Sequence, residues 1–233
     1  MSLSETRDPH PDPFVEGTFL ARLTPEERDA LARIGVRREF RAGAALIFQS
    51  EADDRVMALL NGRVKVSRLE HDGHEILLSI RDPGDLLGEL AFIGSLPRVA
   101  TVTALEPVSA TVIPAGVLRA HLETAPRLAV VLLEIMARRF HDATLQRSHL
   151  GALDTMGRLC VRILELADRY GEALPEGGIA VDSPLTREDI AAWTGASRAG
   201  VADAFRRLRE LGWVETERSA LIVRDPDALR SRA

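Results

Sequence analysis

Apolar residues recur at three- and four-residue steps over residues 125–150, and this pattern predicts one long helix. Its only proline, Pro126, falls in the first turn, where a helix tolerates it. Leu128, Val131 and Ile135 form a short stripe that we expect to close a domain core. A second stripe runs the length of the helix and is expected to meet the same helix of a second copy, although an ordinary buried helix would give a similar pattern. Its members are Ala129, Leu132, Met136, Phe140, Ala143 and Leu150.

Ahead of this helix the apolar pattern has the short period of β-strands. Thr24-Pro25-Glu26-Glu27 first predicts a capped helix that ends at Gly35. Between residues 36 and 114, Asn61-Gly62 and Asp72-Gly73 predict hairpins, because both dipeptides accept positive φ. Short strands at regular spacing indicate a small antiparallel barrel or roll, followed by a short helix to about residue 123. The expected strands are 45–48, 55–60, 63–69, 75–81, 100–105 and 108–113.

After the long helix the pattern predicts a winged helix–turn–helix. An amphipathic helix is expected at 154–170, then two short helices at 186–194 and 197–211, separated by Gly195-Ala196. Thr186 and Ser197 are their predicted N-caps. A last β segment at 214–223 turns at Arg218-Ser219. A helical hairpin without a DNA-binding role would give a similar pattern.

Composition narrows the classes of function. The chain has 233 residues, enough for two modest domains, with 45% hydrophobic and 28% charged residues. The net charge of −5 means that a DNA-binding surface has to be local. The single cysteine, Cys160, excludes disulfide frameworks, iron–sulfur clusters and multi-cysteine zinc sites. No apolar run reaches membrane-spanning length and the polar N-terminus lacks a signal-peptide core, so we expect a cytoplasmic protein.

Two stretches carry candidate chemistry. In the first, Gly84-Asp85 and Gly88-Glu89-Leu90 precede Arg98. Glycines let backbone N–H groups approach an anion, a carboxylate accepts from ribose hydroxyls and an arginine clamps a phosphate, although a purely structural bend would look alike. In the second, Arg198 stands at the start of the last predicted helix, where recognition helices reach base edges.

The order and spacing of these motifs resemble the CRP/FNR family of bacterial transcription regulators, which includes the cyclic-AMP receptor protein. The resemblance covers nearly all of residues 19–223. It rests on the following motifs: Asn61-Gly62-Arg63-Val64, Gly84-Asp85, Gly88-Glu89-Leu90, Arg98, Met136-Ala137-Arg138-Arg139, Leu153-Asp154 and Gly157-Arg158.

The resemblance implies an α+β fold. Its parts would be an N-terminal antiparallel β-roll of the cyclic-nucleotide-binding type (a double-stranded β-helix), a long dimerisation helix and a C-terminal winged helix–turn–helix. The domains implied are a disordered tail at 1–17, an effector-binding roll at 18–124, the dimerisation helix and hinge at 125–152 and the DNA-binding domain at 153–233. The partners implied are palindromic double-stranded DNA, a second copy of the chain and RNA polymerase, with no membrane.

The resemblance also assigns roles to single residues. Glu89 would hold the ribose hydroxyl of a nucleotide, and Gly88 and Arg98 its cyclic phosphate. The other effector positions would be Val66, Leu78, Ser79, Leu90, Val99, Arg139, Ala143 and Thr144. The DNA-binding positions would be Thr186, Ser197, Arg198, Ala199, Gly200, Asp203, Arg206 and Arg218, and Arg198 would read a guanine.

Several positions depart from the family pattern. Val99 stands where cyclic-AMP binders usually carry a hydroxyl, and Ala143 replaces one of two hydroxyl residues that meet adenine. The effector is therefore left open between cyclic AMP, another cyclic nucleotide, another ligand and none. Ala199 replaces a glutamate and Asp203 a basic residue, so the family's usual operator is not expected.

The alternative reading is a ligand-sensing or protein-interaction module of the same fold whose DNA binding is weakened or independent of effector. An enzyme is not expected, because the sequence presents no paired acid and base and no metal site. His71 and His74 fall on a predicted hairpin turn, where solvated side chains are the ordinary case. Cys160 lies on an apolar helix and is expected to be a core residue rather than a sensor.

Overall fold

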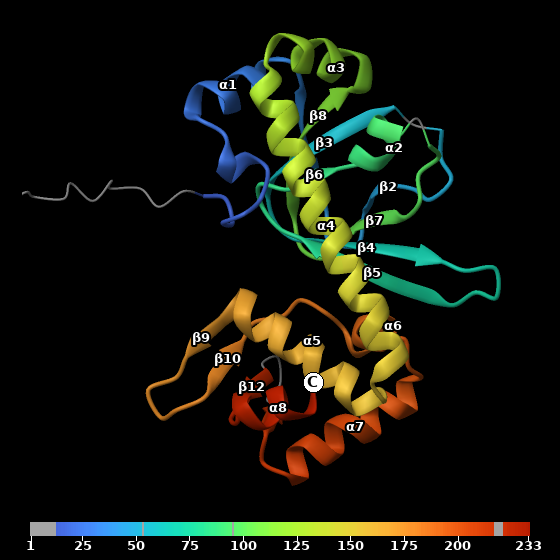
Figure 1. The fold of residues 1–233 in the computed structure, drawn as a ribbon, viewed down its shortest axis with the longest axis vertical. Coiled ribbons are helices and arrows are strands. Elements are labelled where there is room, and N and C mark those ends of the chain that lie inside the picture. The colour runs from blue at the N-terminus through green and yellow to red at the C-terminus, as the bar shows by residue number, and fades with distance from the viewer. Residues whose placement is uncertain (1–12, 53, 95, 217–220) are drawn as a thin grey trace, which may run out of the picture. The chain divides into compact units, whose positions relative to one another are not determined.

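The computed structural model describes residues 13–52, 54–94, 96–216 and 221–233 of the chain (Figure 1). It divides into two compact units. The first contains the described residues up to Val64 together with Ile80–Ala137, and the second contains Lys65–Ser79 together with Arg138–Ala233. No helix among the described residues is long and apolar enough to cross a membrane.

The roll consists of two four-stranded sheets. The first sheet, in spatial order, contains β1 (Val36–Phe40), β8 (Val108–Pro114), β3 (Arg55–Asn61) and β6 (Leu86–Leu87), paired antiparallel throughout. The second contains β2 (Ala45–Ile47), β7 (Thr101–Ala104), β4 (Val64–Leu69) and β5 (Glu75–Arg81). Strand β3 is buried from Val56 to Leu59, as its continuous apolar run requires. The predicted antiparallel roll is therefore confirmed.

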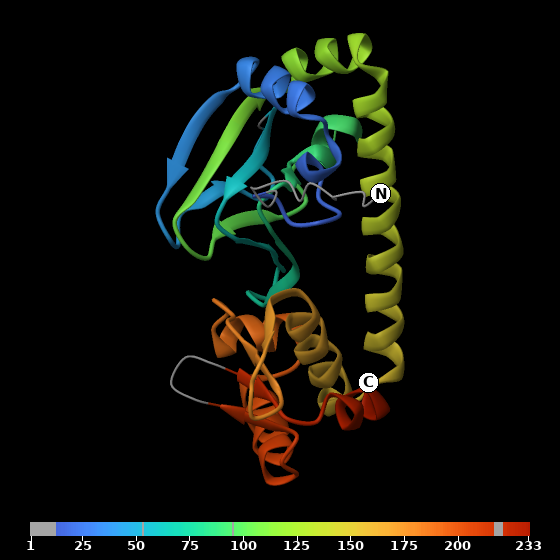
Figure 2. The ribbon, with the colours of Figure 1, turned by 90° about the vertical axis from the view of Figure 1, so that its left-hand side faces the viewer.

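Helices close the first unit around one core. They are the 3₁₀ helix η1 (Leu20–Arg22), α1 (Pro25–Arg33), α2 (Glu89–Gly94), α3 (Ala115–Thr124) and α4 (Pro126–Ala152). The predicted capping box at Thr24 and Glu27 is present at the start of α1. Figure 2 shows α4 as one unbroken helix. Its buried residues Leu128, Val131 and Ile135 pack into the core of the roll, as the short stripe predicted.

The long stripe of α4 needs a correction. Leu132 is buried in the core of the roll and Met136 packs against that core, so neither belongs to the exposed face. Leu132 stands four residues after Leu128 and therefore lies on the same side of the helix. The exposed apolar face instead contains Val130, Leu133, Ala137 and Phe140, which are three or four residues apart. Of these four residues, only Phe140 belongs to the predicted stripe. Phe140 is 77% exposed.

The second unit contains the winged helix–turn–helix. Its helices are α5 (Thr155–Tyr170), α6 (Arg187–Thr194), α7 (Arg198–Glu210) and α8 (Pro226–Arg232). Its strands form a sheet in the order β11 (Val214–Thr216), β12 (Leu221–Val223), β10 (Ile179–Val181) and β9 (Gly171–Ala173). Leu159, Ile163 and Leu166 of α5 are buried where α6, α7 and α8 pack on that helix.

Several local features differ from what the sequence predicts. Asn61-Gly62 does not close a hairpin, because β3 and β4 belong to different sheets. Strand β1 and helices α2 and α8 were not predicted. Of the predicted tail at 1–17, residues 1–12 lie outside the described residues. Within 13–17, Val15 N donates to Pro83 O at 3.1 Å and Phe14 packs against the core.

Candidate effector and DNA-binding sites

The first candidate site begins where β6 leads into α2. Gly88 has φ of +82°, a left-handed conformation that favours glycine. A Cβ at this position would overlap Nη1 of Arg98, so the close approach of the guanidinium also requires glycine. The adjacent Glu89 starts α2 and is only 6% exposed. The structure thus brings Gly88, Glu89 and Arg98 together, as predicted.

Arg98 is held by backbone carbonyl groups. Arg98 is only 4% exposed. Its Nη1 donates to Gly88 O at 2.8 Å, and its Nη2 donates to Arg55 O. Sequence reasoning missed Arg55, because a main-chain oxygen gives no residue-type signal. Two carbonyl groups fix the orientation of the guanidinium, and this group is suited to bind a phosphate bidentately. We name Gly88, Glu89, Arg98 and the carbonyl of Arg55 the phosphate cradle.

The other predicted effector residues are divided between the two units. Leu90 and Val99 are exposed residues of the first unit, close to the cradle in sequence. Val66, Leu78, Ser79, Arg139, Ala143 and Thr144 belong to the second unit. Thr144 Oγ1 donates to Phe140 O at 2.9 Å within α4. A role of these residues beside the cradle stays a prediction.

The second candidate site is the face of α7. Ser197 caps this helix by accepting a hydrogen bond from Gly200 N at 3.1 Å, as predicted. Gly195 adopts φ of +61° in the turn between α6 and α7, a left-handed conformation that glycine permits. Arg198 follows the cap, and its side chain is 80% exposed and 3.4 Å from Glu188 Oε1. This arrangement leaves the predicted guanine-reading side chain accessible.

Carboxylates already pair the arginines further along α7. Asp203 contacts Arg206, and its Oδ2 lies 2.9 Å from Arg207 Nε. Arg206 Nη1 also lies 3.3 Å from Glu210 Oε1. The hydrogen bond from Arg206 holds the pKa of Asp203 below its usual range. Arg218, another predicted DNA-binding residue, lies outside the described residues. Asp203 therefore acts first on its own helix, as a partner of the arginines.

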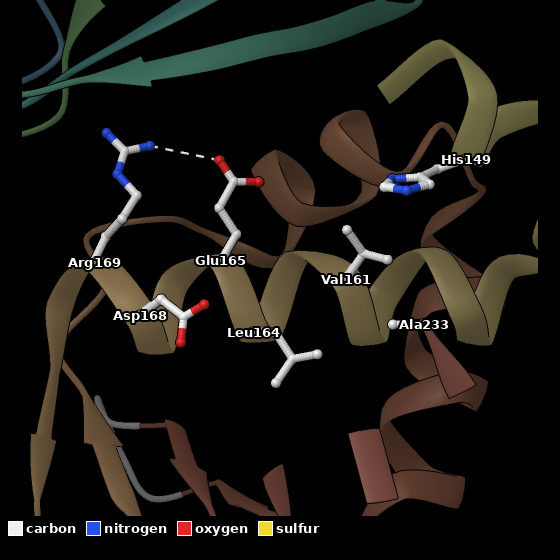
Figure 3. Close-up of a pocket in the computed structure, with 7 residues that line it drawn as sticks. All are labelled: His149, Val161, Leu164, Glu165, Asp168, Arg169 and Ala233. Atoms are coloured by element: carbon white, nitrogen blue, oxygen red, sulfur yellow. Dashed lines mark ion pairs between the residues drawn. The ribbon is translucent and has the colours of Figure 1, made fainter. Parts of the chain in front are cut away.

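One shallow pocket of about 470 Å³ lies along α5 (Figure 3). Glu165 and Arg169 face each other across one turn at 3.5 Å, as Figure 3 shows. The pocket contains none of the predicted effector or DNA-binding residues. The lining residues are His149, Val161, Leu164, Glu165, Asp168, Arg169 and Ala233.

The described histidine and cysteine side chains were the other candidates for metal or redox chemistry. Among the described residues, no group of three or more His, Cys, Asp or Glu side chains is placed to hold a metal ion. His74 and Asp72 are a solvent-exposed pair on the β4–β5 turn. Cys160 is buried on α5, and burial raises the pKa of its thiol to about 11. The thiolate is thus scarce at neutral pH, which fits a core residue.

Comparisons with known proteins identify two domains in this chain. The family model of the cyclic nucleotide-binding domain matches residues 37–125, and the model of the Crp-like helix-turn-helix domain matches residues 157–232. These ranges contain the phosphate cradle and the capped helices α6 and α7 respectively.

Curated relatives and solved structures match most of the chain. A CRP-like cAMP-activated global transcriptional regulator of Mycobacterium tuberculosis is 33% identical over 220 residues, which is 94% of each chain. A global nitrogen regulator of Synechococcus elongatus is 27% identical over 82% of this chain and 86% of its own. A solved structure of a CooA variant from Carboxydothermus hydrogenoformans shares the fold, with a TM-score of 0.78 and 19% identity over 94% of this chain and 96% of that one.

Proposed function

The chain belongs to the CRP/FNR family of transcription regulators, and from this premise we propose that it is a homodimeric, effector-responsive regulator that acts in the cytoplasm. It binds a palindromic DNA site with one α7 helix in the major groove of each half-site. The observation that carries this proposal is the capped, solvent-exposed start of α7, where Arg198 is free of the protein core. No catalytic activity is assigned.

The exposed apolar face of α4 supports dimerisation. Val130, Leu133, Ala137 and Phe140 repeat with the three-and-four spacing of a helix that pairs with its own copy. A monomer would leave this stripe in water, which is costly for large apolar side chains. We expect light scattering to give a dimer mass, and Phe140→Glu to shift the protein toward monomer.

DNA binding is tested by selecting fragments from the organism's own genome. Recovered fragments should share an inverted repeat, and their affinity should fall steeply with salt. Arg198→Ala should lose the preference for a guanine in each half-site. If the dimer recovers no sequence-selective fragment, the second candidate function applies, namely a sensing or protein-interaction module. The pairing of the α7 arginines with carboxylates is the observation that supports this second candidate.

For the effector we propose a cyclic nucleotide whose phosphate binds at Arg98 and whose ribose binds at Glu89. The buried cradle supports this, and so does the similarity to the mycobacterial CRP-like cAMP-activated regulator. A thermal-shift panel of cyclic mono- and dinucleotides tests it. A ligand at 100 times its dissociation constant adds about 2.7 kcal/mol to the free energy of unfolding. No shift with any of them would contradict the proposal.

A further inference from the structure

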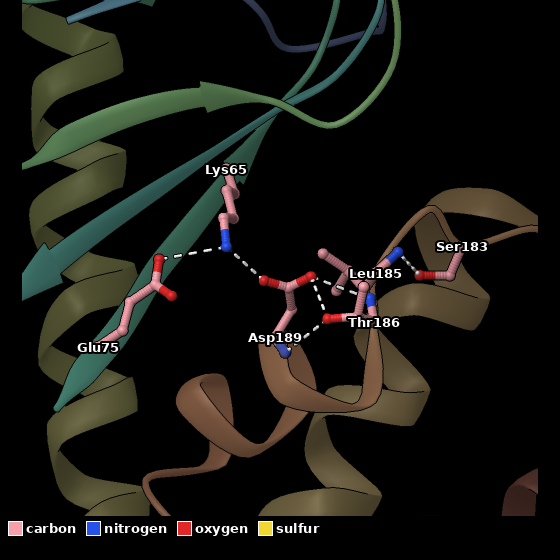
Figure 4. Close-up of polar contacts among 6 residues, drawn as sticks. All are labelled: Lys65, Glu75, Ser183, Leu185, Thr186 and Asp189. Carbon is pink, nitrogen blue, oxygen red and sulfur yellow. Dashed lines mark hydrogen bonds and ion pairs between the residues drawn. The ribbon is translucent and has the colours of Figure 1, made fainter. Parts of the chain in front are cut away.

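The β4–β5 hairpin is joined to the first helix of the helix–turn–helix by one ion pair (Figure 4). Lys65 Nζ on β4 lies 2.6 Å from Asp189 Oδ1 on α6 and 3.2 Å from Glu75 Oε1 on β5. All three residues belong to the second unit. Lys65 is the chain's only lysine, since the other 29 of its 30 basic residues are arginine.

Asp189 has two roles, one on each carboxylate oxygen. Its Oδ2 accepts from Thr186 N at 2.9 Å and from Thr186 Oγ1 at 2.7 Å, which completes the capping box of α6. Its Oδ1 accepts from Lys65. The residue is only 6% exposed, and a carboxylate buried to this extent requires a paired cation. The cap of α6 therefore depends on a side chain from the hairpin.

The protonation states agree with a fully charged pair. Burial alone would raise the pKa of Asp189, but the hydrogen bonds from Lys65 and Thr186 bring it below its usual range. Burial likewise opposes the charge of Lys65, but the hydrogen bonds and the negative charges of Asp189 and Glu75 together outweigh burial and raise the pKa of Lys65. Both groups stay charged at neutral pH.

The strands of this hairpin carry three of the predicted effector residues. Val66 follows Lys65 directly on β4, and Leu78 and Ser79 lie on β5 beside Ile80. Because Lys65 and Val66 are joined by one peptide bond on β4, a ligand that displaces the backbone at Val66 also displaces Lys65. The ion pair then transfers this displacement to the N-terminus of α6.

We infer that Lys65 is a positioning residue, which acts through Asp189 to couple the hairpin to the DNA-binding helices. This inference rests on the proposed function, in which the hairpin borders an effector and α7 binds DNA. It predicts that the pair carries the linkage between the two ligands, while neither ligand needs the pair for its own binding.

The first test uses the dimeric full-length protein with cyclic AMP as the probe. The ratio of DNA affinities with and without the nucleotide, measured by fluorescence anisotropy, gives the coupling, which in allosteric proteins is about 5- to 150-fold. In Lys65→Met and Asp189→Asn this ratio should fall to about 1, while nucleotide affinity stays near that of wild type. Lys65→Arg keeps the charge and should restore part of the ratio. Glu75→Gln, which removes only the more exposed partner, should leave it nearly unchanged.

A merely structural role gives a different result. Lys65→Met would then weaken DNA binding equally with and without nucleotide, the ratio would be preserved, and the inference would be overturned. The second test needs no effector. Amide hydrogen exchange should rise together in residues 65–79 and in α6 of Lys65→Met but not in α1. If no nucleotide changes DNA affinity in wild type, the effector proposal fails, and the exchange result alone tests the coupling of the hairpin to α6. Faster exchange in both segments of Lys65→Met would support the coupling. Unchanged exchange in α6 would overturn it.

Discussion

Arg98 and Arg206 both stand at proposed phosphate-binding surfaces, yet the protein holds them by opposite means. Arg98 is buried, and two backbone carbonyl groups fix its guanidinium. Arg206 is exposed, and the carboxylates of Asp203 and Glu210 pair with it. The buried side chain is already ordered before any ligand arrives, so binding requires little further loss of rotamer freedom. The exposed one has to exchange a carboxylate for a DNA phosphate.

This difference determines how each surface should respond to substitution. A substitution of Arg98 removes a buried side chain whose guanidinium donates hydrogen bonds to two backbone carbonyl groups of the fold. A substitution on α7 changes the balance among charges in water, where each pair contributes little to stability. We therefore expect large, all-or-none effects at Arg98 and graded, salt-dependent effects at Asp203.

The largest effect is expected for Arg98→Ala. Gly88 O and Arg55 O lose the hydrogen bonds from the Arg98 guanidinium, and a hydrogen bond to a charged group contributes about 1.5–3 kcal/mol. The charge-assisted bonds to a bound phosphate are lost as well, so nucleotide affinity should fall by about tenfold to 150-fold. Calorimetry and urea unfolding measure the two effects. Arg98→Lys is the matched control and should retain part of the nucleotide affinity. A nucleotide affinity equal to that of wild type in both variants would show that the cradle is not the phosphate site.

Next in size is Arg198→Ala. A lost bidentate contact to guanine costs about 1–3 kcal/mol per half-site and should relax base preference at one position. Competition binding with operators changed at single base pairs measures this. Arg209→Ala, another exposed arginine of α7, serves as the control and should weaken all sequences alike. A loss of affinity that is uniform over all operator variants would argue against base reading by Arg198.

A smaller and opposite effect is expected for Asp203→Ala. Removal of this carboxylate releases Arg206 and Arg207 for DNA phosphates, so affinity for unrelated DNA should rise. The plot of log affinity against log salt should steepen by about 0.9 for each added phosphate contact. Glu210→Ala releases only Arg206 and should steepen it less. A slope that stays unchanged in both variants would mean that these arginines never reach the DNA backbone.

The smallest expected effect is that of mild acid on the difference in DNA affinity between Asp203→Ala and wild type. The hydrogen bond from Arg206 holds the pKa of Asp203 below the usual range of an aspartate. The pairing therefore persists at any pH above this lowered pKa and is lost only as the pH falls through it. Between pH 7 and 5 the affinity ratio of Asp203→Ala to wild type should stay constant, since both proteins share the same six histidines. A ratio that falls toward 1 by pH 5 would contradict the assigned pKa direction.

The sequence predicted best the elements whose signals are local. Strand β5 and the caps at Thr186 and Ser197 were predicted at their observed positions, because turn dipeptides and N-cap residues act within four residues. The cradle glycine and arginine were predicted through resemblance and lie in contact. Asn61-Gly62 failed as a hairpin signal because strand pairing depends on distant segments, and here the two flanking strands join different sheets.

The rest required three-dimensional information. Strand β1 is almost wholly exposed and lacks apolar alternation, so its pairing with β8 left no pattern to read. Leu132 fits the spacing of both stripes of α4, and only the position of the roll decides between them. The ion pair of Lys65 and Asp189 joins residues 124 positions apart, which no local pattern encodes.

The scarcity of lysine has a practical consequence for measuring this protein. Since Lys65 carries the chain's only ε-amine, an amine-reactive reagent modifies the side chains of this protein at a single place. Acylation requires the unprotonated amine, and the raised pKa of Lys65 keeps that form scarce while Asp189 is its partner. Mass spectrometry can follow how fast a peptide that contains residue 65 becomes labelled. This labelling rate therefore reports how often the ion pair of Lys65 and Asp189 opens in the wild-type sequence.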